Sequence, residues 1–127
     1  MGDRATFVIE SRSEPLYLYG HWAGEGMLDN LAKAIEAALP RIEMEDDVYA
    51  TRIIISYLIG DDWRSDTGWG LSTYFCDAEH SVPVVNLKTK TVRLLPHSWV
   101  DEFDINATPK FTMSLEAFVK KFSKVLV

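Results

Sequence analysis

Four side chains able to ligate a metal ion lie in two short stretches of the chain. His21 follows a strand-like segment, and Asp77, Glu79 and His80 fall within one turn-like stretch. Imidazole and carboxylate groups are common ligands of zinc and iron. However, the chain has no HExxH and no cysteine pair, and the neighbours Glu79 and His80 point to opposite sides if the chain is extended. A turn of solvated polar residues is the preferred interpretation, and no metal or other cofactor is expected.

A thiol nucleophile is the second possible chemistry. Cys76 is the only cysteine of the chain, and a catalytic thiol would need His80 or His21 beside it as a base. The sequence predicts that Cys76 ends a strand, where a lone cysteine is usually a small buried hydrophobic residue. The preferred interpretation is therefore structural. Because there is only one cysteine, no intrachain disulfide can form, which favours a reducing cytoplasm.

Glycines also precede the first predicted helix, as they do in phosphate-binding loops. Gly20, Gly24 and Gly26 match neither GxGxxG nor GxxxxGK[ST]. In addition, Glu25 places a carboxylate where a phosphate would bind. These glycines instead predict a tight turn that needs a positive φ angle.

Aromatic side chains give the strongest binding signal in the sequence. Trp22, Trp63 and Trp69 lie at predicted strand ends and in a loop rich in turn formers, close to acidic residues. Tyrosine and tryptophan anchor many protein interfaces, although they also fill the cores of small sheets. We therefore predict a partner-binding surface and no catalytic residue. Its predicted members are His21, Trp22, Trp63, Trp69, Asp77, Glu79 and His80.

The composition restricts the class of protein. The 127 residues suffice for one globular domain, residues 1–127, and the net charge is −6 at pH 7. A surface that follows phosphates needs clustered Lys and Arg, so nucleic-acid binding is not expected. No apolar run is long enough to span a bilayer, and the first residues lack the apolar core of a signal peptide. A cytoplasmic protein with no membrane partner is the expectation.

Hydrophobic periodicity places eight elements along the chain. Alternating residues predict two strands that form a hairpin, Thr6–Ser11 and the LYLYGHW stretch from Leu16. Helical spacing predicts three helices, which end at Leu39, Ile59 and Leu126. Pro40 should stop the first of them. The second helix, Val48–Ile59, contains three isoleucines that would also suit a strand. The remaining predicted elements are the strands Leu71–Cys76, Pro83–Leu87 and Thr91–Leu95, and a last helix capped by Ser114.

This order, ββααβββα, predicts an α+β domain. Five strands joined mostly by hairpins imply a mostly antiparallel sheet, and about three helices should pack on one face. The alternating rather than continuous apolar character of the strands agrees with a sheet that helices cover on one side only.

Four sequence blocks resemble a group of small uncharacterised proteins from bacteriophages and actinobacteria. They are LYLYGHWAGEGM, YATRIIISYLIG, TGWGLST and DAEHSVPVVNLKTKTV, within residues 16–94. The chain differs from the group at Gly20, where threonine is frequent, and at Asn86, where aspartate is frequent. The resemblance implies a phage accessory protein in a bacterial host cytoplasm. It implies no activity and no catalytic residue.

The leading functional hypothesis is therefore a non-enzymatic, acidic accessory protein that binds a host or phage protein. Two alternatives remain open. One is a metal- or thiol-dependent enzyme that uses His21, Asp77, Glu79, His80 and Cys76. The other is a self-associating structural protein, in which a hairpin edge or the last helix pairs two copies into a homodimer.

Overall fold

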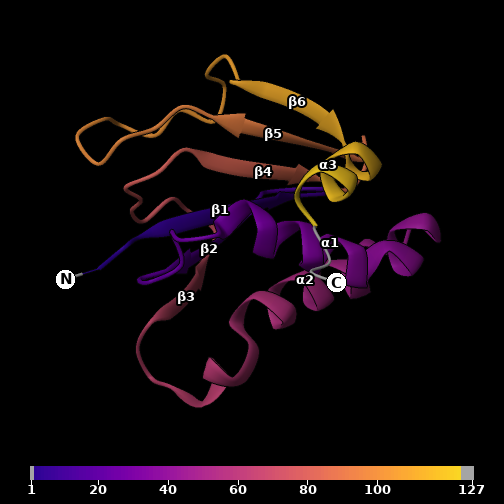
Figure 1. Ribbon diagram of the computed structural model, residues 1–127, viewed down its shortest axis with the longest axis horizontal. Helices are drawn as coiled ribbons and strands as arrows, with labels where there is room; N and C mark the ends of the chain where they lie inside the picture. Colours follow the sequence, from indigo (N-terminus) through magenta and orange to yellow (C-terminus); the bar gives the residue numbers. More distant parts are fainter. Residues whose placement is uncertain (1, 124–127) are drawn as a thin grey trace.

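A computed structural model describes residues 2–123 and shows one α+β domain (Figure 1). Six strands and three α-helices follow one another along the chain, with one short 3₁₀ helix between the second α-helix and the third strand. The elements are β1 (Ala5–Glu10), β2 (Leu16–Gly20), α1 (Met27–Glu43), α2 (Asp47–Ile59), η1 (Gly60–Arg64), β3 (Trp69–Ser72), β4 (Val82–Asn86), β5 (Thr91–Leu95), β6 (Phe111–Ser114) and α3 (Leu115–Phe122).

All six strands form one mixed sheet in the order β3-β2-β1-β4-β5-β6. Four pairings are antiparallel, and β1 and β4 run parallel at the centre. The α+β class is confirmed, but the predicted five strands and the order ββααβββα are wrong: the sheet has six strands, and one of its pairings is parallel. The parallel pair arises because the chain leaves β3 at one edge and crosses the sheet to reach β4.

Helices α1, α2 and α3 cover one face of this sheet, as predicted (Figure 1). The largest fully buried side chains beneath them include Phe7 of β1, Leu18 of β2 and Phe118 of α3. These residues come from strands and helices far apart in sequence and belong to one apolar cluster. Burial of this kind contributes about 25 cal/mol per Å² of apolar surface, so the cluster fixes how the helices lie on the sheet.

Irregular segments cover the other face. Val8, Tyr17, Val84 and other side chains of this face form a second buried cluster. Phe75, from the segment after β3, stacks on Phe103, from the segment after β5, with ring centroids 4.4 Å apart. The alternation of Tyr and Leu in β2 therefore serves two cores, one on each face of the sheet.

The predicted end of α1 at Leu39 is wrong. The helix continues through Pro40 to Glu43. Proline removes one helical hydrogen bond, but the extra turn buries Ile42 in the main core and keeps Leu39 packed against it. Tertiary burial offsets the local cost here.

The second helix is confirmed as helical. It begins with Asp46 as its N-cap, whose carboxylate accepts a hydrogen bond from the Tyr49 backbone N–H. Ile54 is fully buried in the main core, and Gly60 follows the helix with a positive φ angle. The capping signals therefore outweigh the β propensity of the isoleucines.

Two strand predictions need correction. The predicted strand Leu71–Cys76 is in fact β3, Trp69–Ser72, because the chain then turns so that Phe75 covers the second core. Strand β6, Phe111–Ser114, was not predicted; only its last residue, Ser114, had an assignment, as the cap of the last helix. The hairpin of β4 and β5 is confirmed.

The last helix is confirmed between Leu115 and Phe122, with the Ser114 hydroxyl accepting a hydrogen bond from the Ala117 N–H. The predicted extension to Leu126 lies outside the described residues. Among residues 2–123, no helix is both long and apolar enough to cross a membrane.

Candidate binding surface

Arg4 ties the Asp77–His80 turn to the start of β1. Its guanidinium donates to Asp77 at 2.6 Å and to Glu79 at 3.0 Å, and its backbone N–H also donates to the Glu79 carboxylate. Hydrogen bonds from the Arg4 backbone and then its side chain lower the pKa of Glu79. In turn, the hydrogen bond to Glu79 raises the pKa of Arg4. Both carboxylates are thus engaged in holding the segment after β3 against the sheet.

His80 is engaged in the same way. Its Nε2 lies 2.5 Å from the Asp3 carboxylate. The backbone of Gly24 passes directly beside this pair, because a Cβ built there would meet both Asp3 Oδ1 and His80 Nε2. A side chain at position 24 would therefore have to displace the Asp3–His80 contact. The predicted positive φ is found at Gly26.

His21 lies on the other side of the N-terminal segment. Its Nδ1 is 2.7 Å from the Tyr19 hydroxyl, and its backbone carbonyl accepts a hydrogen bond from the Asp3 N–H. Gly2 packs against the imidazole, since a Cβ there would lie 2.6 Å from His21 Nε2. Burial, and then the charge of Asp77, raise the pKa of Tyr19. His21 and the Asp77–His80 turn are therefore close in space, but residues 2–4 lie between them.

This arrangement does not assemble a metal site. Within residues 2–123, no three His, Cys, Asp or Glu side chains are grouped so that they could hold an ion. Cys76 is exposed rather than buried, contrary to expectation, because it follows the end of β3. It lines a surface hollow with His97, a histidine outside the predicted set.

Trp22 follows the same end of β2 as His21, and Trp69 begins β3, which pairs with β2 there. Trp22 and Trp69 line a small hollow of about 180 Å³ together with Asp62, whose carboxylate accepts a hydrogen bond from the Trp69 indole at 3.3 Å. The Trp22 ring packs over Gly68, which also lines the hollow. Trp69 is half-buried against the main core. Trp22 and Trp63 are 63% and 70% exposed, which is unusual for such large apolar side chains.

Strand β3 forms the edge of the sheet beside this hollow (Figure 1). Its pairing with β2 matches Tyr19 with Gly70 and Leu18 with Leu71. One step beyond the strand, His21 N–H donates to the Gly68 carbonyl. Hydrogen-bonded and non-bonded residue pairs alternate along an antiparallel ladder. Because the His21–Gly68 pair is hydrogen-bonded, the pairs of Gly70 and Ser72 with β2 are hydrogen-bonded too, and those of Trp69 and Leu71 are not. The backbone N–H and C=O groups of Trp69 and Leu71 therefore point to the free edge.

We call this region the β3 edge surface. It differs from the predicted set, because the structure separates that set into two groups joined by His21, whose ring contacts Trp22 at 4.6 Å. Asp77, Glu79 and His80 belong to internal contacts with Asp3 and Arg4. Leu71 and Asp62 were not among the predicted residues, although the acidic and aromatic composition of residues 61–70 was the available signal. The β3 edge surface comprises Trp22, Asp61, Asp62, Trp63, Arg64, Asp66, Trp69 and Leu71.

Comparisons with known proteins show no match to a protein-family model, to a curated protein or to a solved structure. The resemblance to small phage and actinobacterial proteins thus stays a prediction.

Proposed function

We propose that this chain is a non-enzymatic, protein-binding module that adds a basic, extended segment of its partner to the sheet beside β3. The observation that carries the proposal is the outward direction of the Trp69 and Leu71 backbone groups on an edge strand. Strand addition of this kind obtains affinity from main-chain hydrogen bonds and specificity from side-chain contacts. A free edge is also the part of a sheet that most readily pairs with another chain.

The charge beside this edge favours a basic partner. Asp61, Asp62 and Asp66 are exposed and outnumber Arg64, the one basic residue of the β3 edge surface. The whole chain carries a net charge of −6. Complementary charge accelerates encounter and disfavours partners of the wrong sign, so a segment rich in Lys and Arg is the expected occupant.

Exposed apolar side chains supply the anchors. Leu71 is 55% exposed on the strand itself, and Trp22 and Trp63 are exposed as well. The Arg64 guanidinium lies 5.1 Å from the centre of the Trp63 ring, so that ring already accepts a cation–π contact. An arginine of the partner segment could make the same cation–π contact with an exposed tryptophan ring of this surface.

Pairing of β3 with a second copy is the competing use of this edge. Two copies would bring like-charged aspartates together, which opposes association. Light scattering at two concentrations distinguishes the cases: a monomer at both agrees with the proposal, and a concentration-dependent dimer that the Leu71→Pro variant loses contradicts it. The resemblance of residues 16–94 makes a phage or host protein the expected partner.

A library of displayed 12-residue peptides tests the proposal directly. Selection on the wild-type chain should enrich sequences rich in Lys and Arg that also carry β-branched residues at alternate positions. Binding should weaken as salt rises, because exposed charges are screened. Selection of acidic or helical sequences, or of none that exceeds background, would contradict the proposal.

A pair of variants at Leu71 provides the matched control. Leu71→Pro removes the outward N–H and leaves the β2 ladder bonds in place, since proline is tolerated where an edge N–H faces solvent. Leu71→Ala removes the side chain and keeps the N–H. We expect the proline variant to lose the selected peptides and the alanine variant to bind them within about tenfold. Equal binding by both would show that the backbone edge is not used.

A further inference from the structure

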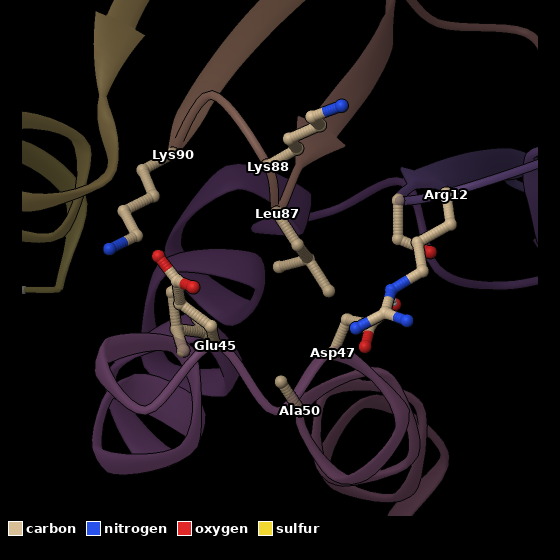
Figure 2. Close-up of a pocket in the computed structure, with 9 residues that line it drawn as sticks. Arg12, Glu45, Asp47, Ala50, Leu87, Lys88 and Lys90 are labelled. Atoms are coloured by element: carbon tan, nitrogen blue, oxygen red, sulfur yellow. Dashed lines mark ion pairs between the residues drawn. The ribbon is translucent and has the colours of Figure 1, made fainter.

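A second cavity lies at the opposite end of the strands from the polar cluster around Arg4. It has a volume of about 520 Å³ and opens between the ends of β1 and β4 and the junction of α1 with α2 (Figure 2). Ser11 and Arg12 line it after β1, and Leu87, Lys88 and Lys90 line it after β4. None of these residues belongs to the β3 edge surface.

The sheet topology explains why a cavity forms here. Strands β1 and β4 are parallel neighbours, so their carboxyl ends lie at the same edge. From there the chain turns toward β2 after β1 and toward β5 after β4, which lie on opposite sides. Diverging connections leave a crevice outside the carboxyl ends of the strands, the usual position of ligands in sheets with such a switch point.

The lining combines an apolar centre with opposite charges. In Figure 2, Leu87 and Ala50 point toward the centre from the sheet side and the helix side. Lys90 and Arg12 extend from the strand-end loops toward Glu45 and Asp47 of the helix junction. The basic groups thus lie on one wall and the acidic groups on the other.

Within residues 2–123, one ion pair spans these walls, and it is easily replaced. Arg12 Nε lies 3.4 Å from the Asp47 carboxylate, and the Arg12 side chain is 81% exposed, whereas that of Asp47 is only 19% exposed. An exposed pair at this distance contributes little. A ligand cation can therefore replace Arg12 at the half-buried Asp47 carboxylate, because the loss of this ion pair costs little free energy.

Backbone strain is concentrated at the same cavity. Among residues 2–123, only Glu45 and Lys90 combine a side chain with a positive φ angle, 58° and 57°. Both line the cavity. Glycine would adopt this conformation without strain, yet each position carries a charged side chain directed to the rim. Such strain is concentrated at ligand sites and switch regions.

We infer that this cavity binds a small zwitterion with an apolar side chain, of the amino-acid or short-peptide type. An anionic group of the ligand pairs with Lys90 and Arg12, a cationic group pairs with Glu45 and Asp47, and the apolar part covers Leu87. A purely anionic ligand would face two carboxylates within the same cavity. The volume lies in the range of small-molecule sites, and the apolar centre with few charged groups is typical of them.

The test uses leucine and trileucine, each in free, N-acetylated and C-amidated form, with inorganic phosphate as a purely anionic probe. Amide NMR spectra of the whole chain report binding at residues 45–50 and 87–90. We expect a free compound to shift these amides and each blocked form to bind at least about tenfold more weakly, because a charged hydrogen bond is lost. Leucine and trileucine distinguish an amino acid from a peptide.

Variants make the assignment specific. Asp47→Asn and Lys90→Gly should each weaken binding about tenfold or more, whereas Lys33→Ala, on an exposed part of α1 outside the cavity, should leave it unchanged. Three results would overturn the inference: no shift with either free compound, equal binding of free and blocked forms, or tighter binding of phosphate than of the zwitterions. None of these bears on the β3 edge surface.

Discussion

Replacing Lys90 by glycine is expected to stabilise the fold. Lys90 lies in the β4–β5 turn, where the Asn86 side chain accepts hydrogen bonds from the N–H groups of Lys88 and Thr89. The φ angle of Lys90 is 57°. Its carbonyl accepts a hydrogen bond from the Leu115 N–H, which glycine would keep. The variant therefore changes the backbone preference and removes one exposed side chain.

The magnitude follows from two opposing terms. A left-handed conformation costs an L-residue about 1–2 kcal/mol, and the larger backbone entropy of unfolded glycine costs about 0.5–1 kcal/mol. The difference predicts that Lys90→Gly raises the free energy of unfolding by about 0.5–1 kcal/mol. With a urea slope of about 1–3 kcal/mol per M, the unfolding midpoint should rise by roughly 0.5 M.

Lys90→Ala is the control, because it removes the same side chain and keeps the strained φ angle. Urea unfolding followed by tryptophan fluorescence measures all three chains. The reasoning is refuted if the glycine variant is no more stable than the alanine variant. If Lys90→Gly gains stability and loses the zwitterion, lysine is maintained at this position for binding rather than for folding.

Two further changes test the contacts that position the candidate surfaces. Contacts with Arg4 lower the pKa of Glu79. The ionised Glu79 side chain therefore stabilises the fold fully above pH 4.5, its usual pKa, and this stabilisation is lost as the pH falls through the lowered pKa. Glu79→Gln should accordingly make the free energy of unfolding less dependent on pH in the acid range. Urea titrations at several pH values measure this, and an unchanged pH dependence would contradict it. Ser114→Ala should lower the free energy of unfolding by about 1 kcal/mol, because α3 loses its N-terminal cap. An unchanged urea midpoint would show that packing alone fixes this helix.

Local signals predicted much of the fold. The caps Asp46 and Ser114 and the turn at Gly26 fixed where helices begin, and these are contacts within a few residues of one another. Alternation predicted β1, β2 and the β4–β5 hairpin for the same reason. The helix end predicted from Pro40 was wrong, because the local cost of the proline is offset by the burial of Ile42 against residues distant in sequence.

Non-local pairing explains the rest. The parallel contact of β1 with β4 joins residues such as Val8 and Val84, and no local pattern indicates which strands become neighbours. That pairing also creates the cavity and the position of Arg4 beside Glu79. The aromatic composition indicated the tryptophans as candidate binding residues. The direction of the β3 backbone groups, in contrast, can be derived only from the register of β3 with β2.

Hydrogen exchange at β3 tests the central claim most directly. In the free chain, the backbone amides of Trp69 and Leu71 should exchange quickly, and those of Gly70 and Ser72 slowly, because only the latter bond to β2. A basic peptide from the selection should slow Trp69 and Leu71 at least about tenfold and leave Gly70 and Ser72 nearly unchanged. This alternating pattern is the predicted result. Binding without protection of Trp69 and Leu71 would contradict strand addition at this edge.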